Sequence, residues 1–535
     1  MSQQLVYNAE TCEYEPIDLS GSVPEKARTK QESTKVKLYE YLMFGILKRG
    51  SIIDKIELNA EIVGIIRSFS VGTRKDIDFL VKTIIKSCTK WNTKNSIAIL
   101  ALVILSASPK TYAKEKFLQI FKDVVKTDDD LIEFMELIKT DSIRGFGKII
   151  QKAIQKWFND LSPYEALKIK RRQVRTPRQT ANGAEYTISD ILRLAHVKPK
   201  DDEQSSLYKW LLTGEFDSKI HQSIKASEWY KKTTTLSPQK REITKNNNIP
   251  VEVLKPIKSP VDAYINILPQ LSFNDLLRNF TLLSEKGVFL NESAKKHVIK
   301  VFKSKQIINR SGALPHQFFE LYDQNTSASI EILAALETAA ENAYVNLPKI
   351  NKKITIFVDR SGTAKSSFAS DSTKVPLHYT FATFSSIIAK ISKSTDIYTF
   401  SKDVVKQDFN SKENTLEISD SIIDKKTTSH STNNVELFKF LSESNIKSDI
   451  LIFFSASLRW EEVLRGTDSG SYLTNYMNRI GGETQRIIFV NSNNQGVMFD
   501  HTLRLTDFIH GWNERNLKYL LYLLQADYTK IDDII

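Results

Sequence analysis

The spacing of hydrophobic residues changes abruptly near Pro348, and this change limits the folds open to the chain. From about residue 36 to 345, apolar residues recur three and four positions apart, which is typical of amphipathic helices. After Pro348, short apolar runs alternate with helix-like stretches, which is typical of a layered α/β sheet. The pattern therefore predicts a helical part followed by a mostly parallel sheet with helices between its strands.

The helical part shows no exact repeat, but helical pairs recur at roughly 30 to 45 residues, which favours a degenerate HEAT-like solenoid. A first apolar stripe, made of Leu38, Tyr41, Leu42, Ile46 and Leu47, predicts a helix that continues past Ile46. The acidic run 128–130 predicts the start of another, because negative charge stabilises a helix N-terminus.

We predict three segments along the chain. Residues 1–35 are expected to be weakly ordered, residues 36–345 to form the helical module, and residues 346–535 to form the α/β domain. Within the last segment, the predicted strands cover 354–358, 396–400, 449–454 and 485–490, and a predicted helix covers 379–392. Ligands of such a sheet bind beyond the carboxyl ends of the strands, where residues 359–363 fall.

The balance of basic and acidic residues also changes near residue 340. Residues 1–340 hold 52 basic and 40 acidic side chains, whereas residues 341–535 hold 23 of each. The whole net charge of +12 thus belongs to the helical part. A localised positive excess attracts polyanions, so nucleic acid is the first expected partner, with an anionic membrane surface and a simple solvated surface as alternatives.

Several protein classes lack support. The longest apolar run, 97–105, is too short to span a bilayer, so we expect no membrane-spanning helix and do not favour a membrane as partner. Cys12 and Cys88 provide neither a disulfide framework nor a zinc site, which fits a cytoplasmic protein. The usual phosphate-loop, zinc-protease and serine-hydrolase motifs are absent, so we expect no catalytic activity and no required cofactor.

Between residues 168 and 200, basic side chains far outnumber the two acidic ones, Glu185 and Asp190. The basic residues are Lys168, Lys170, Arg171, Arg172, Arg175, Arg178, Arg193, Lys198 and Lys200. If Lys168, Arg171, Arg172 and Arg175 are helical, their spacing places them on one face, where they can follow a phosphate backbone. The alternative is an ordinary solvated helix end.

A second basic pattern lies just upstream. Lys148, Lys152 and Lys156 are spaced four residues apart, which predicts a basic helical face beside an apolar one. The same spacing also suits an ordinary amphipathic surface helix. His196 is a candidate for stacking on a base or bonding to it, although a single histidine is more often structural.

In combination, these residues resemble the TROVE module of Ro autoantigen proteins. The resemblance rests on ordered strings over residues 36–535: 144–147 with 157–159, 191–199, 276–279, 315–318, 332–336 and 357–359. It implies HEAT-like helices closed into a ring by a von Willebrand A-like domain. It further implies a monomeric protein that binds Y-type small noncoding RNAs outside the ring and single-stranded ends of misfolded RNAs in its hole.

The resemblance also assigns residues and partners. Lys168, Arg172 and His196 match family positions linked to RNA contact, and an exoribonuclease or other RNA-processing protein is an expected partner. The stretch 170–186 is a departure from the family pattern, which affects the contacts between these anchors. The competing hypothesis is a protein-interaction adaptor that binds polypeptides. Charge segregation and the resemblance together favour RNA quality control or a ribonucleoprotein scaffold.

The α/β domain also holds a candidate magnesium site. A-type domains hold a divalent cation with oxygen ligands from three loops. Asp359, Ser361 and Thr363 supply the first loop and Thr432 the second, but Ala456 stands where an aspartate is expected. The missing carboxylate predicts that magnesium is not held, with Asp359 instead accepting hydrogen bonds from the turn.

Overall fold

The computed structural model describes most of the chain. The described residues are 5–8, 13–16, 34–48, 51–52, 60–89, 96–140, 146–173, 186–232, 249–254, 261–367, 375–423, 434–456, 472–473, 475–476, 478–479, 486–491, 506–510 and 514–525. They fall into two compact units. The helical unit comprises Leu38–Gly45, Ile53–Leu347 and Thr529–Ile535, and the sheet unit comprises Met1–Lys37, Ile46–Ile52 and Pro348–Tyr528.

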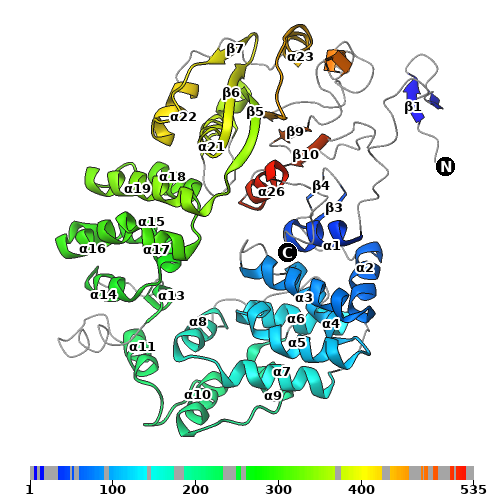
Figure 1. Cartoon of the computed structure of the whole chain (residues 1–535). Coiled ribbons are helices and arrows are strands. Elements are labelled where there is room, and N and C mark those ends of the chain that lie inside the picture. Colours follow the sequence, from blue (N-terminus) through cyan, green and yellow to red (C-terminus); the bar gives the residue numbers. More distant parts are fainter. Residues whose placement is uncertain are drawn as a thin grey trace. The chain divides into compact units, whose positions relative to one another are not determined.

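The helical unit is a succession of short helices (Figure 1). In chain order they are α1 (Thr34–Phe44, from Leu38 onward), α2 (Ala60–Val71), α3 (Arg74–Thr89), α4 (Ser96–Ser106), α5 (Thr111–Val124), α6 (Asp128–Thr140), α7 (Lys148–Asn159), α8 (Pro163–Gln173), α9 (Ile188–Leu194), α10 (Asp202–Thr213), α11 (Gln222–Lys232), α13 (Val251–Leu254), α14 (Val261–Ile267), α15 (Phe273–Glu285), α16 (Glu292–Lys303), α17 (Lys305–Ser311), α18 (Pro315–Gln324) and α19 (Ile330–Asn342). Three 3-10 turns, η2 (Leu268–Gln270), η3 (Val288–Leu290) and η4 (Ala343–Asn346), connect them.

The apolar run 97–105 forms the centre of one helical group. Every residue of α4 from Ile97 to Ser106 is buried, and α4 packs against α2, α3, α5 and α6. A helix that is apolar on all sides is stable only when other helices cover it. The helices around α4 are therefore amphipathic, with an apolar side for α4 and a polar side for solvent. None of the helices in the described part of the chain is both long and apolar enough to cross a membrane.

The expected helix starts and ends are partly confirmed. α6 begins at Asp128, and the Asp130 carboxylate accepts hydrogen bonds from the backbone N–H groups of Lys126 and Thr127. The prediction that the first helix continues past Ile46 is wrong. α1 ends at Phe44 because Gly45 adopts a left-handed conformation with φ 71° and donates to the Tyr41 carbonyl, and Ile46 starts strand β3 (Ile46–Lys48).

The main sheet of the sheet unit has, among the described residues, six strands in the order β10-β9-β8-β5-β6-β7, all parallel except β7. The strands are β5 (Ile350–Asp359), β6 (Ser392–Phe400), β7 (Val404–Gln407), β8 (Ile450–Ser455), β9 (Arg486–Asn491) and β10 (Thr506–His510). The helices are α20 (Gly362–Ser366), α21 (Leu377–Ile391), α22 (Thr415–Ile423), α23 (Asn434–Glu443) and α26 (Glu514–Gln525). Each of the four predicted strands overlaps an observed one, and the predicted helix overlaps α21.

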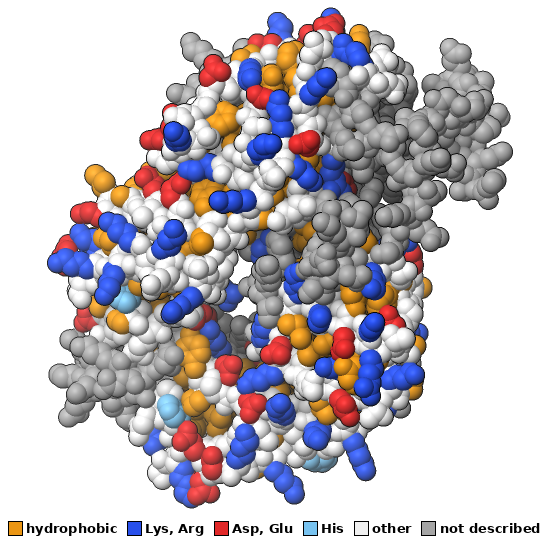
Figure 2. All heavy atoms as spheres, viewed as in Figure 1, with side chains coloured by type: hydrophobic (Ala, Val, Ile, Leu, Met, Phe, Trp, Pro, Cys, Tyr) orange, Lys and Arg blue, Asp and Glu red, His pale blue; other side chains and the backbone are white. Residues whose placement is uncertain are grey.

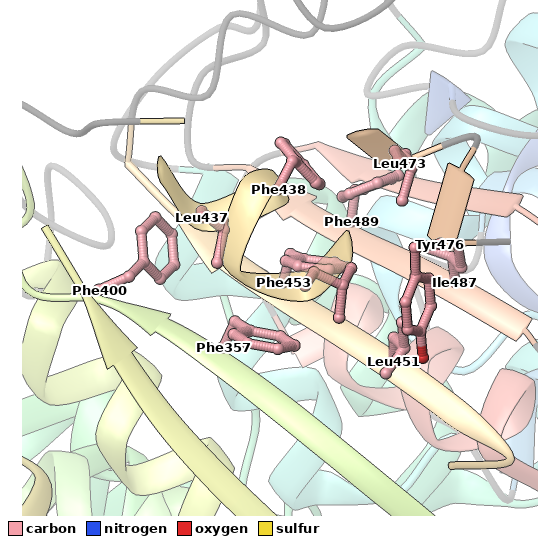
Figure 3. Packing of buried hydrophobic residues seen from close by; sticks show 11 residues of the cluster. Phe357, Phe400, Leu437, Phe438, Leu451, Phe453, Leu473, Tyr476, Ile487 and Phe489 are labelled. Carbon is pink, nitrogen blue, oxygen red and sulfur yellow. The ribbon is translucent and has the colours of Figure 1, made fainter. Parts of the chain in front are cut away.

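Aromatic side chains fill one face of this sheet (Figure 3). Phe357, Phe453 and Phe489 stand in register on adjacent strands, with ring centroids 4.9 and 5.0 Å apart. Leu437 and Phe438 of α23 pack on them. Phe381 of α21 instead contacts Phe454, the next residue along β8, so helices cover both faces.

Short strands also occur near the N-terminus. β1 (Leu5–Asn8) pairs with β2 (Glu13–Pro16), and β3 pairs with β4 (Ser51–Ile52), both antiparallel. The weak order expected for residues 1–35 concerns a segment that lies mostly outside the described residues.

Candidate nucleic-acid interface

Helix α7 presents the lysine stripe that its sequence predicts. Lys148, Lys152 and Lys156 are exposed, while the opposite face, made of Ile150, Ala153, Ile154, Trp157 and Phe158, is buried. The Trp157 indole donates a hydrogen bond to the Val125 carbonyl at 2.8 Å, which fixes the rotation of the helix about its axis. No ion pair joins the three ammonium groups to any residue in the described part of the chain. They are therefore available to an external anion.

The turn after α9 is held beside this stripe by two glutamines. Gln151 and Gln155 of α7 donate their side-chain amides to the Ala195 carbonyl at 3.2 and 2.9 Å. Each glutamine directly precedes a lysine of the stripe, so the turn and the lysines lie on adjoining parts of the helix surface. α9 itself is fixed by a capping box between Thr187 and Asp190.

His196 occupies this turn in an unusual backbone conformation. Its φ is 48°, which no other non-glycine residue shares in the part of the chain that the structure describes. The left-handed region costs a side-chain-bearing residue of the order of 1 kcal/mol or more. The backbone N–H of His196 donates to the Arg193 carbonyl at 3.1 Å, and the imidazole is exposed. The turn thus keeps an aromatic, hydrogen-bonding ring at the surface next to lysines.

Three further cations extend the surface. Arg193 is 63% exposed and makes only a loose pair with Asp190 at 3.7 Å, and Lys198 is exposed. Lys200 donates to the Asn159 carbonyl at 2.9 Å, which ties this loop to the end of α7. We call the set Lys148, Lys152, Lys156, Arg193, His196, Lys198 and Lys200 the α7–α9 surface. Lys and Arg side chains mark the lower edge of Figure 2, where α7 and α9 lie in Figure 1.

Lys168 and Lys170, also predicted to contact RNA, are engaged within the protein. The Lys168 ammonium is 3.3 Å from Asp275 of α15 and 4.6 Å from the centre of the Tyr164 ring. The Lys170 ammonium donates to the Leu211 carbonyl of α10 at 2.9 Å. Both residues connect α8 to other helices.

The remaining basic residues of the cluster are less fully described. α8 extends to Gln173, so Arg171 and Arg172 are helical as predicted, but their side chains lie outside the described residues. Arg175 and Arg178 lie outside them altogether. The structure therefore brings Lys148, Lys152, Arg193, His196 and Lys198 together, while RNA contact by the α8 residues stays a prediction.

The ion pair between Lys168 and Asp275 is mostly buried, and it affects the pKa of Asp275. The side chains of Lys168 and Asp275 are 22% and 15% exposed. Burial alone raises the pKa of Asp275, but hydrogen bonds from Ser272 and Tyr164 and the charge of Lys168 outweigh it, so the pKa is lowered. The carboxylate is ionised at neutral pH and holds α8 against α15.

Asp359, the first residue of the candidate magnesium site, accepts hydrogen bonds from the protein itself. Asp359 is fully buried, and its carboxylate accepts from the Ser361 N–H at 2.8 Å, the Ser455 hydroxyl at 3.0 Å and the Ala456 N–H at 3.1 Å. Ser361 caps α20, which contains Thr363. Thr432 lies outside the described residues. The described residues hold no cluster of three or more metal-ligating His, Cys, Asp or Glu side chains.

Ala456 supplies no carboxylate where an aspartate is expected. Its backbone N–H donates to Asp359, a hydrogen bond that does not depend on the side chain at this position. These donors satisfy the Asp359 carboxylate, whereas a hard cation needs several converging oxygens, and the absence of bound magnesium stays a prediction.

No family model matches this chain, and no curated protein matches its sequence. Among solved structures, it is similar to the crystal structure of the Deinococcus radiodurans RO (RSR) protein, at 14% sequence identity. The likeness has a TM-score of 0.69 and covers 92% of this chain and 99% of that one. The fold expected from the sequence resemblance, a helical part with an A-like domain, is confirmed. Closure into a ring stays a prediction.

Proposed function

We propose that this chain, which has the fold of a Ro protein, is an RNA-binding protein whose α7–α9 surface holds the backbone of structured RNA. The observation that carries the proposal is the exposed, unpaired lysine stripe of α7 beside the turn of His196. Lysines at this spacing neutralise successive phosphates without reading sequence. The imidazole of His196 adds a group that stacks on or bonds to a base.

The finer features belong to the same proposal. We infer that the RNAs are small structured noncoding RNAs of the Y type and the single-stranded ends of misfolded RNAs. The chain then acts without catalysis, as a scaffold in RNA quality control in the cytoplasm, where an exoribonuclease or similar protein takes over its RNA. The confinement of the net positive charge to residues 1–340 supports RNA binding by the helical part.

A charge-removing variant of α7 tests the proposal. Lys148→Gln, Lys152→Gln and Lys156→Gln combined should weaken binding of a hairpin RNA and reduce the slope of log affinity against log salt by about 2 to 3, since each duplex phosphate contact contributes about 0.9. Titration over about 50 to 200 mM salt measures both quantities.

The control removes the same kind of charge elsewhere on the helical unit. Lys209 and Lys219 are exposed and already paired, with Glu215 at 3.8 Å and Asp202 at 2.6 Å. Lys209→Gln with Lys219→Gln should bind the hairpin nearly as the parent does. Equal binding by the α7 variant and the parent, with circular dichroism showing both folded, would contradict the proposal.

A further inference from the structure

A second uncompensated basic region lies on α16 and α17. No aspartate or glutamate occurs from Ser293 to Phe319, whereas six lysines and arginines do. They are Lys295, Lys296, Lys300, Lys303, Lys305 and Arg310. Sequence reasoning missed this region because its charge density is lower than that of residues 168–200; the absence of acidic residues was the signal that could have found it.

The helix geometry places most of these charges in solvent. Ala294, Val298 and Phe302 of α16 are buried, and the helix packs on α17, α19 and η3. Lys296, Lys300 and Lys303 are exposed at spacings of four and three, which is one helical face. α17 follows directly after Ser304 and exposes Lys305 and Arg310. In Figure 2, several Lys and Arg side chains lie at the left edge, where α16 lies in Figure 1, together with a few Asp and Glu side chains.

Lys295 differs from the other five cations. Its ammonium pairs with Glu292 at 2.8 Å and Glu331 at 3.7 Å. In the described part of the chain, no ion pair or hydrogen bond engages the side chains of the other five. We call these five, Lys296, Lys300, Lys303, Lys305 and Arg310, the α16–α17 surface.

Helix stabilisation does not account for this arrangement. Lys300 and Lys303 lie in the last turn of α16, where the helix dipole favours cations by about 0.3 to 1 kcal/mol each. Lys296 is not in that turn, and Lys305 begins α17, whose first turn contains no acidic residue. Like charges at these spacings also repel each other by a few tenths of a kcal/mol. An anion bound from outside the chain would relieve this repulsion.

The charge of this surface also affects a neighbouring side chain. His297 follows Lys296 on α16 and precedes Lys300 by three residues. Burial lowers its pKa, and the charge of Lys300 lowers it further. The imidazole is consequently neutral at physiological pH and adds no positive charge to the surface.

We propose that the α16–α17 surface is a second contact for the RNA backbone, on a different group of helices from the α7–α9 surface. The inference rests on the proposed function. The contact is with phosphates and not with bases, because Phe289 and Phe302, the phenylalanines nearest to these cations in sequence, are buried, and His297 is partly buried. An anionic membrane fits less well, since an amphipathic helix inserts into a membrane surface through an exposed apolar face and that of α16 is covered.

The test uses the full chain and a hairpin RNA with a single-stranded 3′ tail. Lys296→Gln with Lys300→Gln should weaken binding by about ten- to a hundredfold at low salt and reduce the salt slope by about 1.5 to 2. The paired-lysine variant Lys209→Gln with Lys219→Gln is the matched control. Thermal unfolding by circular dichroism verifies that all variants are folded, which is expected because the replaced side chains are exposed.

The outcomes separate the two proposals. If only the α7 variant loses affinity, the α16–α17 contact is overturned and the proposed function stands. If neither variant loses affinity, both are overturned. If the α16 variant retains RNA binding but loses binding to phosphatidylserine vesicles, the surface is a membrane contact and the inference is wrong.

Discussion

His196 combines a strained backbone with an exposed ring, and the two can be separated by substitution. Glycine accepts the left-handed conformation freely, so His196→Gly should leave the free energy of unfolding unchanged or raise it by about 1 kcal/mol. The same variant should lose about 1 to 3 kcal/mol of RNA affinity with little change in salt slope. Denaturation and RNA titration measure the two effects. A variant that is less stable and binds RNA normally would mean that the ring packs within the protein.

Lys168 is predicted to act mainly through stability. Lys168→Met leaves the Asp275 carboxylate without its cation and should lower the free energy of unfolding by about 2 to 3 kcal/mol. Lys209→Met, which breaks an exposed pair, should cost less than about 1 kcal/mol. RNA titration of the folded variant then tests whether Lys168 also contacts RNA, as the sequence resemblance implies.

The pH dependence follows from the same pair. Because the pKa of Asp275 is lowered in the folded protein, its stabilisation is present above the unfolded pKa of about 4 and is lost as pH falls through the folded pKa. The stability difference between the parent and Lys168→Met should therefore be constant near neutrality and narrow below about pH 4. Urea denaturation at several pH values measures this difference; a gap that persists in acid would assign the loss to packing.

At the scale of elements, two hydrogen bonds position the turn after α9. Gln151→Ala with Gln155→Ala removes both bonds to the Ala195 carbonyl and should cost about 1 to 3 kcal/mol of local stability. Hydrogen exchange of residues 193–198 should rise, and RNA affinity should fall although no charge is lost. Gln119→Ala on the exposed face of α5 is the control. Unchanged exchange in the double variant would show that the turn is held by other contacts.

The loops after β5 and β8 are predicted not to bind magnesium. Because the Asp359 carboxylate is bonded to three protein donors, added magnesium should not raise the melting temperature of the parent chain. Asp359→Asn should lower stability in the same way with and without magnesium. A magnesium-dependent rise in the parent that is absent in the variant would establish a metal site.

For the whole molecule, the two patterns of hydrophobic spacing were enough to predict both architectures, because helical and strand periods are local properties of the sequence. The lysine stripe of α7 was predictable for the same reason. The pairing of Lys168 with Asp275 was not, since nothing local indicates a partner 107 residues away. The end of α1 was not predictable either. The apolar pattern continues beyond Gly45, but the left-handed conformation of this glycine ends the helix.

The same long-range pair constrains how the protein is made. A ribosome adds about 5 to 20 residues per second, so Lys168 of α8 is synthesised roughly 5 to 20 seconds before Asp275 of α15. During that interval the Lys168 ammonium has no Asp275 to bind, and α8 can dock only on helices already synthesised. The helical unit therefore cannot complete its packing in strict order from the N-terminus, and its final step waits for a helix encoded much later in the message.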